Sequence, residues 1–204
     1  MKGNIISDAE GLKRSTNETD GIYRYGDTVY ISGTRGGPLD HEWTHNFKYI
    51  AKPIITDIGS KILGLKSITE KPDIELNKID RVKNTLNYLN NNPDVKKVVG
   101  FSVGGIASDV AKQQYKDLRG NVYGTPSINF LGIKNNGSNL NRYRIAGDIL
   151  ASLDNSASTK FIPSKLFNPI GAHSFQEQGS KNFASDASQA FGKVANDGSL
   201  LLFQ

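Results

Sequence analysis

The chain has 204 residues, a formal net charge of +5, 37% hydrophobic residues and no cysteine. These values are typical of a single globular domain, 1–204, and the lack of cysteine excludes a disulfide framework, a thiolate zinc site and a cysteine nucleophile. No apolar stretch reaches the length of a membrane span, the N-terminus does not resemble a secretory signal, and no dense Lys/Arg block indicates nucleic-acid binding. We therefore expect a soluble protein, with a cytoplasmic location favoured.

The first half of the chain predicts a polar arm, a hairpin and two helices. Residues 1–20 are polar and are expected to form a loosely held N-terminal arm. Two β-prone runs flank Gly26-Asp27, a dipeptide typical of hairpin turns. Apolar residues at helical spacing predict one helix that ends before Pro53 and another that runs from Asp80 to an NNNP sequence.

The second half of the chain predicts strands that alternate with helices. A valine-rich strand at 95–99 precedes a helix over 106–118, and further strands are expected at 121–123 and 143–146. Such alternation is typical of a mainly parallel sheet with helices on both faces, so the predicted fold class is α/β. In the C-terminal tail, 176–204, helical spacing predicts a helix that packs on the core, or one that contacts a partner or a lipid surface.

Residues 100–104 spell Gly-Phe-Ser-Val-Gly, which fits the G-x-S-x-G pattern of a nucleophile elbow. The strand expected before it and the helix expected after it supply the context that this pattern needs. In that context a sharp turn lifts the Ser102 hydroxyl above the sheet edge, and the Val103 N–H at the helix start can donate to an oxyanion. The alternative is an ordinary serine N-cap at a glycine-rich helix start.

A nucleophilic serine needs a base and an acid that orients the base. His173 is the only histidine after Ser102, and in α/β-hydrolases the acid precedes the histidine in the chain. Asp148 directly follows a predicted strand and is preferred as the acid over its rival Asp154. The predicted catalytic residues are therefore Ser102, Asp148 and His173. A histidine without a catalytic role, at the surface or the core edge, is the alternative for His173.

A collinear series of motifs between residues 28 and 175 resembles the lipase class 3 (fungal-lipase-like) family of α/β-hydrolases. The matching segments are VYISGT (29–34), EWTHNF (42–47), VGFSVGG (99–105), NVYGTPSINF (121–130) and YRIAGDILASL (143–153), and His173 falls where the family has its histidine. The chain departs from the family in having Phe101 before the nucleophile, where histidine is usual. Its loop after Gly33 is also too short for the large lid of interfacial lipases.

The resemblance implies a compact α/β-hydrolase fold and a lipase- or esterase-like hydrolase of carboxylic esters that needs no cofactor. It implies that His173 takes the Ser102 proton and that Asp148 holds the imidazole in the required tautomer. It also implies an oxyanion hole made by Thr34 and Val103. Glycerolipids and phospholipids are substrates typical of the family, and the mild positive charge favours peripheral contact with an anionic lipid surface.

Two other functions stay open. His41-Glu42-x-x-His45 spells HExxH, which on a helix can bind zinc through both histidines and use the glutamate as the general base of a metallopeptidase. No third ligand has a recognisable signature, and the motif directly follows a loop, so the main hypothesis includes no metal. The other alternative is a catalytically silent hydrolase fold with a binding or structural role.

Overall fold

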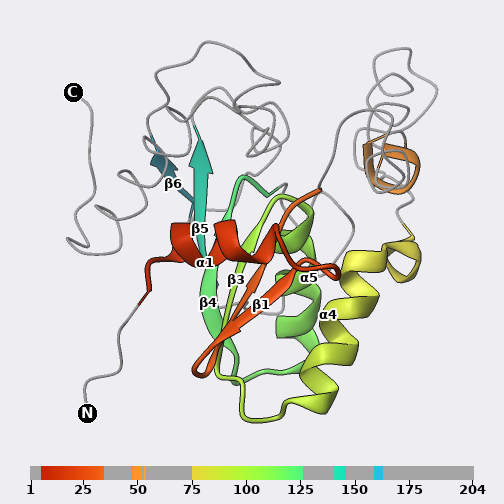
Figure 1. The fold of residues 1–204 in the computed structure, drawn as a ribbon. Helices are drawn as coiled ribbons and strands as arrows, with labels where there is room; N and C mark the ends of the chain where they lie inside the picture. Colours follow the sequence, from red (N-terminus) through yellow and green to blue (C-terminus); the bar gives the residue numbers. More distant parts are fainter. Residues whose placement is uncertain are drawn as a thin grey trace, which may run out of the picture.

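A computed structural model of the chain describes residues 6–34, 47–51, 53, 75–125, 140–145 and 159–162. In these residues six strands form one sheet in the order β1-β2-β3-β4-β5-β6 (Figure 1). The strands are β1 (Ile22–Tyr25), β2 (Thr28–Ile31), β3 (Lys97–Phe101), β4 (Arg119–Tyr123), β5 (Leu140–Ile145) and β6 (Thr159–Ile162). β1 is antiparallel to β2, and every later pair of neighbours is parallel. The predicted α/β class with a mainly parallel sheet is confirmed in these residues.

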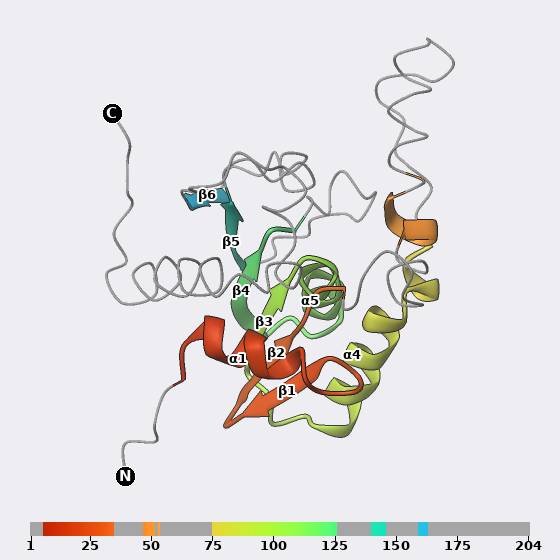
Figure 2. The same cartoon turned by 45° about the horizontal axis from the view of Figure 1, so that its top comes forward.

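Helices cover both faces of the sheet. Helices α4 (Asp80–Asn91) and α5 (Val103–Gln114) lie on one face, and α1 (Asp8–Ser15) lies on the other (Figure 2). Two short helical segments, η1 (Phe47–Ala51) and η2 (Leu76–Lys78), complete the described elements. The described helices are all too short or too polar to traverse a lipid bilayer.

The core is divided by the sheet because successive side chains of a strand point to opposite faces. On the face covered by α4 and α5, Val98 of β3 and Val122 of β4 pack with Val82 and Ile106 from the two helices. The α1 face is aromatic and comprises Ala9, Leu12, Tyr30, Val99, Phe101, Tyr123 and Tyr143. Both faces of the central strands are therefore buried, as expected for a parallel sheet.

The prediction of a loosely held N-terminal arm is wrong for residues 8–15, which form α1 against the sheet. Ala9 and Leu12 are buried there, and Asp8 is 5% exposed. Asp8 accepts hydrogen bonds from Tyr123 at 2.8 Å and from Asn121, and it pairs with Lys97 Nζ at 3.2 Å. Burial, and secondly the negative charge of Asp8, raise the pKa of Tyr123. The polarity of this stretch hid a helix that is held by a buried carboxylate.

Several other predicted elements are confirmed, with shifted ends. The hairpin turns at Gly26, and α4 spans the predicted stripe. α5 ends at Gln114 rather than near residue 118, and β4 and β5 each begin earlier than expected. β6 was not predicted. The helix expected in the C-terminal tail, 176–204, lies outside the described residues.

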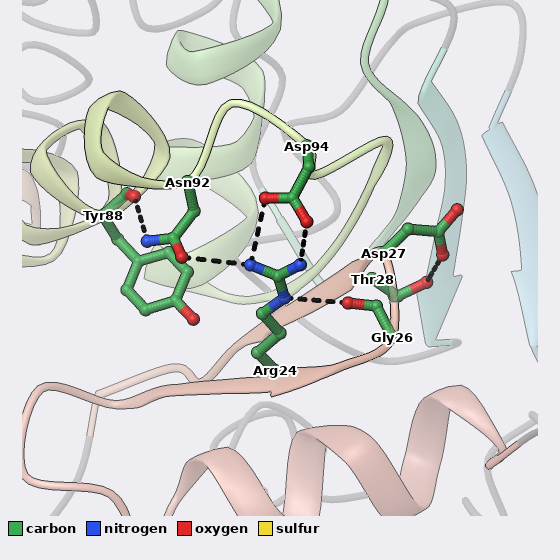
Figure 3. Close-up of polar contacts among 7 residues, drawn as sticks. All are labelled: Arg24, Gly26, Asp27, Thr28, Tyr88, Asn92 and Asp94. Carbon is green, nitrogen blue, oxygen red and sulfur yellow. Dashed lines mark hydrogen bonds and ion pairs between the residues drawn. The ribbon is translucent and has the colours of Figure 1, made fainter.

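Arg24 links the β1–β2 hairpin to the connection between α4 and β3 (Figure 3). Its guanidinium donates to the Gly26 carbonyl at 2.8 Å and to the Asn92 side-chain oxygen at 3.0 Å. The same group forms an ion pair with Asp94. The ion pair with Arg24 lowers the pKa of Asp94. These contacts hold the turn of the hairpin. Thr34 follows the opposite end of β2.

Candidate active site

Ser102 occupies the turn between β3 and α5 in a backbone conformation that L-residues rarely adopt. Its φ is 54° and its ψ is −120°, and it is the only non-glycine residue with positive φ in the described part of the chain. The turn is held from the neighbouring strand, because the Ser102 N–H donates to the Tyr123 carbonyl at 2.9 Å. The Thr125 hydroxyl lies 3.2 Å from the Ser102 carbonyl and 3.1 Å from the Tyr123 carbonyl and can donate its proton to either. Ser102 is thus held through both its N–H and its carbonyl.

Ser7, the N-cap of α1, shows how a purely structural serine behaves in the same chain. Ser7 has an extended backbone with φ −69° and ψ 155°, and its side chain accepts the Glu10 N–H at 3.1 Å. This is the usual geometry of a capping serine. Ser102 also precedes a helix, but its backbone is not extended and its side chain makes no capping hydrogen bond. The geometry therefore disagrees with the alternative of an ordinary N-cap.

The glycines of the G-x-S-x-G pattern are required by close backbone contacts. A Cβ on Gly104 would overlap the Ile31 carbonyl and lie 2.6 Å from the Ser32 carbonyl oxygen. A Cβ on Gly100 would overlap the Gly104 carbonyl. Both glycines allow the first turn of α5 to pack directly on the ends of β2 and β3.

Thr34 belongs to a segment that runs beside Ser102. β2 and β3 are parallel neighbours, so both lead to the same edge of the sheet. A Cβ built on Gly33 would lie 2.9 Å from Cδ1 of Phe101 and 3.0 Å from Cβ of Ser102. The structure therefore brings the segment that carries Thr34 next to the turn that carries Ser102 and Val103.

The start of α5 provides backbone donors at this edge. Two of these N–H groups are already engaged within the turn: those of Gly105 and Ile106 donate to the Ser102 carbonyl, at 2.9 and 3.3 Å. Val103 is the first residue of the helix, where an N–H has no acceptor within the helix. The helix dipole adds partial positive charge at the same place. A negatively charged oxygen beside Ser102 would be stabilised by both effects.

A buried ion pair anchors α5 to β5. Nη1 of Arg142 donates to both carboxylate oxygens of Asp109, at 2.9 and 2.7 Å. The two side chains are 3% and 0% exposed, respectively. Because α5 begins at the Ser102 turn, this pair helps to fix the turn relative to the strand that precedes Asp148 in the chain.

The remaining predicted site residues lie outside the described residues. These are Asp148 and His173 of the predicted triad and His41, Glu42 and His45 of the HExxH motif. Within the described ranges, no group of three or more His, Cys, Asp or Glu side chains could hold a metal ion. The triad and the zinc alternative therefore stay predictions.

Two residues near the turn were missed by the sequence analysis. Thr125 follows the strand predicted at 121–123, and a Cβ on Gly105 would overlap its hydroxyl oxygen, so the two residues are in close contact. Arg81 drew no attention because an arginine on a helix is usually solvated, yet it is 4% exposed and donates to the Gly33 carbonyl. The adjacent glycines Gly104 and Gly105 are the sequence feature that could have indicated close packing by another residue, here Thr125.

Comparison with known proteins finds no matching family model, no matching curated protein and no matching solved structure. The described residues form an α/β protein with a serine on a sharp turn between a parallel strand and a helix. The functional conclusion therefore depends on the chemistry of that turn.

Proposed function

We propose that the protein is a serine hydrolase of carboxylic esters, with an α/β-hydrolase fold and Ser102 as its nucleophile. The observation that carries the proposal is the backbone of Ser102, with φ 54° and ψ −120° at a strand-to-helix turn. An L-residue in such a region costs about 1–3 kcal/mol, and strain of this kind is concentrated at functional sites. Glycine would adopt the conformation without that cost. A serine there is explained by a use for its hydroxyl.

The surroundings of Ser102 support the same chemistry. When the hydroxyl attacks an ester carbonyl, negative charge develops on the carbonyl oxygen, and nearby N–H donors stabilise it. The Val103 N–H at the helix start and the Thr34 N–H on the adjacent segment are the proposed donors. Each such donor typically contributes about 10²–10³-fold to kcat.

The full mechanism follows the predicted triad. His173 accepts the Ser102 proton as the Oγ–carbon bond forms, and Asp148 holds the imidazole in the productive tautomer. Collapse of the tetrahedral intermediate expels the alcohol, which takes the proton from His173, and leaves an acyl-enzyme. Water, deprotonated by His173, then adds to the acyl carbon, and the carboxylic acid leaves as Ser102 regains its proton.

The test is hydrolysis of a p-nitrophenyl ester series, from acetate to decanoate, together with labelling by a fluorophosphonate located by peptide mass analysis. We expect turnover and labelling at Ser102, both abolished in Ser102→Ala. Ser7→Ala is the matched control, because it removes a structural serine at the start of another helix. It should retain labelling and turnover while losing about 1 kcal/mol of stability.

Three outcomes would contradict the proposal. Wild type and Ser102→Ala that are equally inert across the series would indicate a catalytically silent fold. Turnover that persists in Ser102→Ala would place the nucleophile elsewhere. Activity that is lost on chelation and restored by zinc would favour the HExxH motif at His41 and His45.

A further inference from the structure

We infer that Arg81 is a positioning residue that sets the orientation of the Thr34 N–H in the proposed oxyanion hole. This inference rests on the proposed function, because it concerns a donor of that same site. It goes beyond the predicted triad and oxyanion-hole residues, since Arg81 lies on α4 and contacts the Gly33 carbonyl rather than any reacting atom.

Arg81 bridges two backbone segments from inside the protein. Its side chain is buried, with the residue 4% exposed. Nη2 donates to the Gly33 carbonyl at 3.3 Å, and Nη1 donates to the Asp20 carbonyl. Arginine presents several donors in a planar fork, which suits it to holding two carbonyl groups at once. A charged group is costly to bury, so its placement here calls for a specific role.

The space for the guanidinium is made by a glycine. Gly21 has φ +69°, and a Cβ at that position would overlap Nη1 of Arg81. The Gly21 carbonyl also accepts the Ser32 N–H at 2.9 Å, which ties this turn to the residue before Gly33. The turn at Asp20–Gly21, the end of β2 and the start of α4 therefore meet around one side chain.

Because the peptide bond between Gly33 and Thr34 is planar, the contact of Arg81 with the Gly33 carbonyl also sets the direction of the Thr34 N–H. The described chain contains no cis peptide bond, so the carbonyl of Gly33 and the N–H of Thr34 point in opposite directions within one plane. Holding the carbonyl toward Arg81 keeps the Thr34 N–H directed away from Arg81. A peptide flip at this bond would exchange the donor for an acceptor oxygen, which would repel an oxyanion.

Gly33 lies against the Ser102 turn, so the orientation of the Gly33–Thr34 peptide affects the immediate surroundings of Ser102. A Cβ on Gly33 would lie 3.0 Å from Cβ of Ser102. The positive guanidinium at the carbonyl end also polarises the peptide, which makes the Thr34 N–H a stronger donor. Both effects would stabilise negative charge that is absent from the bound ester and develops as the hydroxyl attacks.

The first test is Arg81→Lys, which keeps the charge but cannot hold two carbonyl groups in a planar fork. Catalytically competent Ser102 is counted by end-point fluorophosphonate labelling, and kcat and KM for p-nitrophenyl butyrate are expressed per labelled site. We expect labelling near one per chain, a kcat lowered at least tenfold and a KM changed less than twofold, because an oxyanion donor acts mainly in the transition state. Leu89→Ala, which loosens the same helix elsewhere, should leave kcat per labelled site within twofold.

The second test leaves Arg81 unchanged and displaces its guanidinium. Gly21→Ala places a Cβ where Nη1 lies, whereas Gly26→Ala has nothing within 4 Å of its new Cβ. The two glycines have similar φ values, +69° and +62°, so both substitutions carry similar backbone strain. We expect kcat per labelled site to fall at least tenfold in Gly21→Ala and to stay within twofold of wild type in Gly26→Ala.

The outcomes separate this inference from the proposed function. If the wild type is active and labelled, an unchanged kcat per labelled site in Arg81→Lys overturns the inference but not the proposed function. A fall in kcat per labelled site that Leu89→Ala reproduces has the same meaning. Equal effects of Gly21→Ala and Gly26→Ala overturn it as well. A wild type that neither labels nor turns over refutes the proposed function, and the inference with it.

Discussion

Replacing Ser102 by glycine separates the cost of its backbone conformation from the chemistry of its hydroxyl. At φ 54° and ψ −120° the serine is strained by about 2 kcal/mol, which glycine would recover. Glycine loses about 0.7 kcal/mol because it is freer in the unfolded chain, and burial of one methylene is worth about 0.8 kcal/mol more. The net expectation is a gain of about 0.5 kcal/mol in the free energy of unfolding, with complete loss of labelling and turnover.

Ser108→Gly on the same helix is the control, because Ser108 is fully buried within α5. No strain is recovered there, so we expect a loss of about 1.5 kcal/mol or more. Urea denaturation followed by circular dichroism measures both values. In thermal unfolding the two variants should differ by roughly 4–8 °C, since 1 kcal/mol corresponds to about 2–4 °C in a chain of this size. If Ser102→Gly is destabilised as much as Ser108→Gly, Ser102 stores no strain and the argument for its role fails.

Three further outcomes are expected. Gly104→Ala should lower the free energy of unfolding by about 1–3 kcal/mol in urea titration and abolish the proposed esterase activity, because the new Cβ meets rigid backbone; an unchanged midpoint would contradict the packing described. Asp109→Ala should cost about 3–5 kcal/mol by leaving Arg142 buried without its partner, whereas Asp109→Leu combined with Arg142→Met should recover most of the loss. Arg24 lowers the pKa of Asp94 in the folded protein. The ion pair therefore stabilises the fold fully above the ordinary aspartate pKa, and this contribution is lost as pH falls through the lowered pKa. The stability difference between wild type and Asp94→Asn should therefore shrink on acidification, and a constant difference would contradict it.

The parts of the fold that were predicted are those whose signals are local. The hairpin at Gly26 and the apolar stripe of α4 are each specified by a few neighbouring residues. Helix α1 was missed because its main polar anchor, Asp8, is satisfied by side chains about 90 to 115 positions further along the chain. No local pattern reports such partners, and a buried carboxylate in a polar stretch looks the same as an exposed one.

The candidate site divides in the same way. The elbow at Ser102 could be predicted because strand, turn and helix are contiguous in the chain, and the parallel pairing of β2 and β3 brings Thr34 to it. Arg81 could not be predicted, because its role depends on carbonyl groups at Asp20 and Gly33 that come together only in the folded chain. A backbone carbonyl has no sequence signature, so positioning residues of this kind become visible only in three dimensions.

Backbone contacts, more than side-chain packing, set the precision of this site. A shortened core side chain leaves a cavity that its neighbours can partly fill, whereas a Cβ added at Gly104 meets the Ile31 and Ser32 carbonyls, which have no rotamers to change. At Gly33 a new Cβ would instead meet side-chain atoms, Cβ of Ser102 and the ring of Phe101, and of these the Ser102 Cβ is fixed directly by its backbone. The donors of the proposed oxyanion hole must lie about 2.7–3.1 Å from the developing charge and be placed to within about 0.5 Å of that geometry. A turn built on direct backbone contact can position the donors with that precision before any substrate binds.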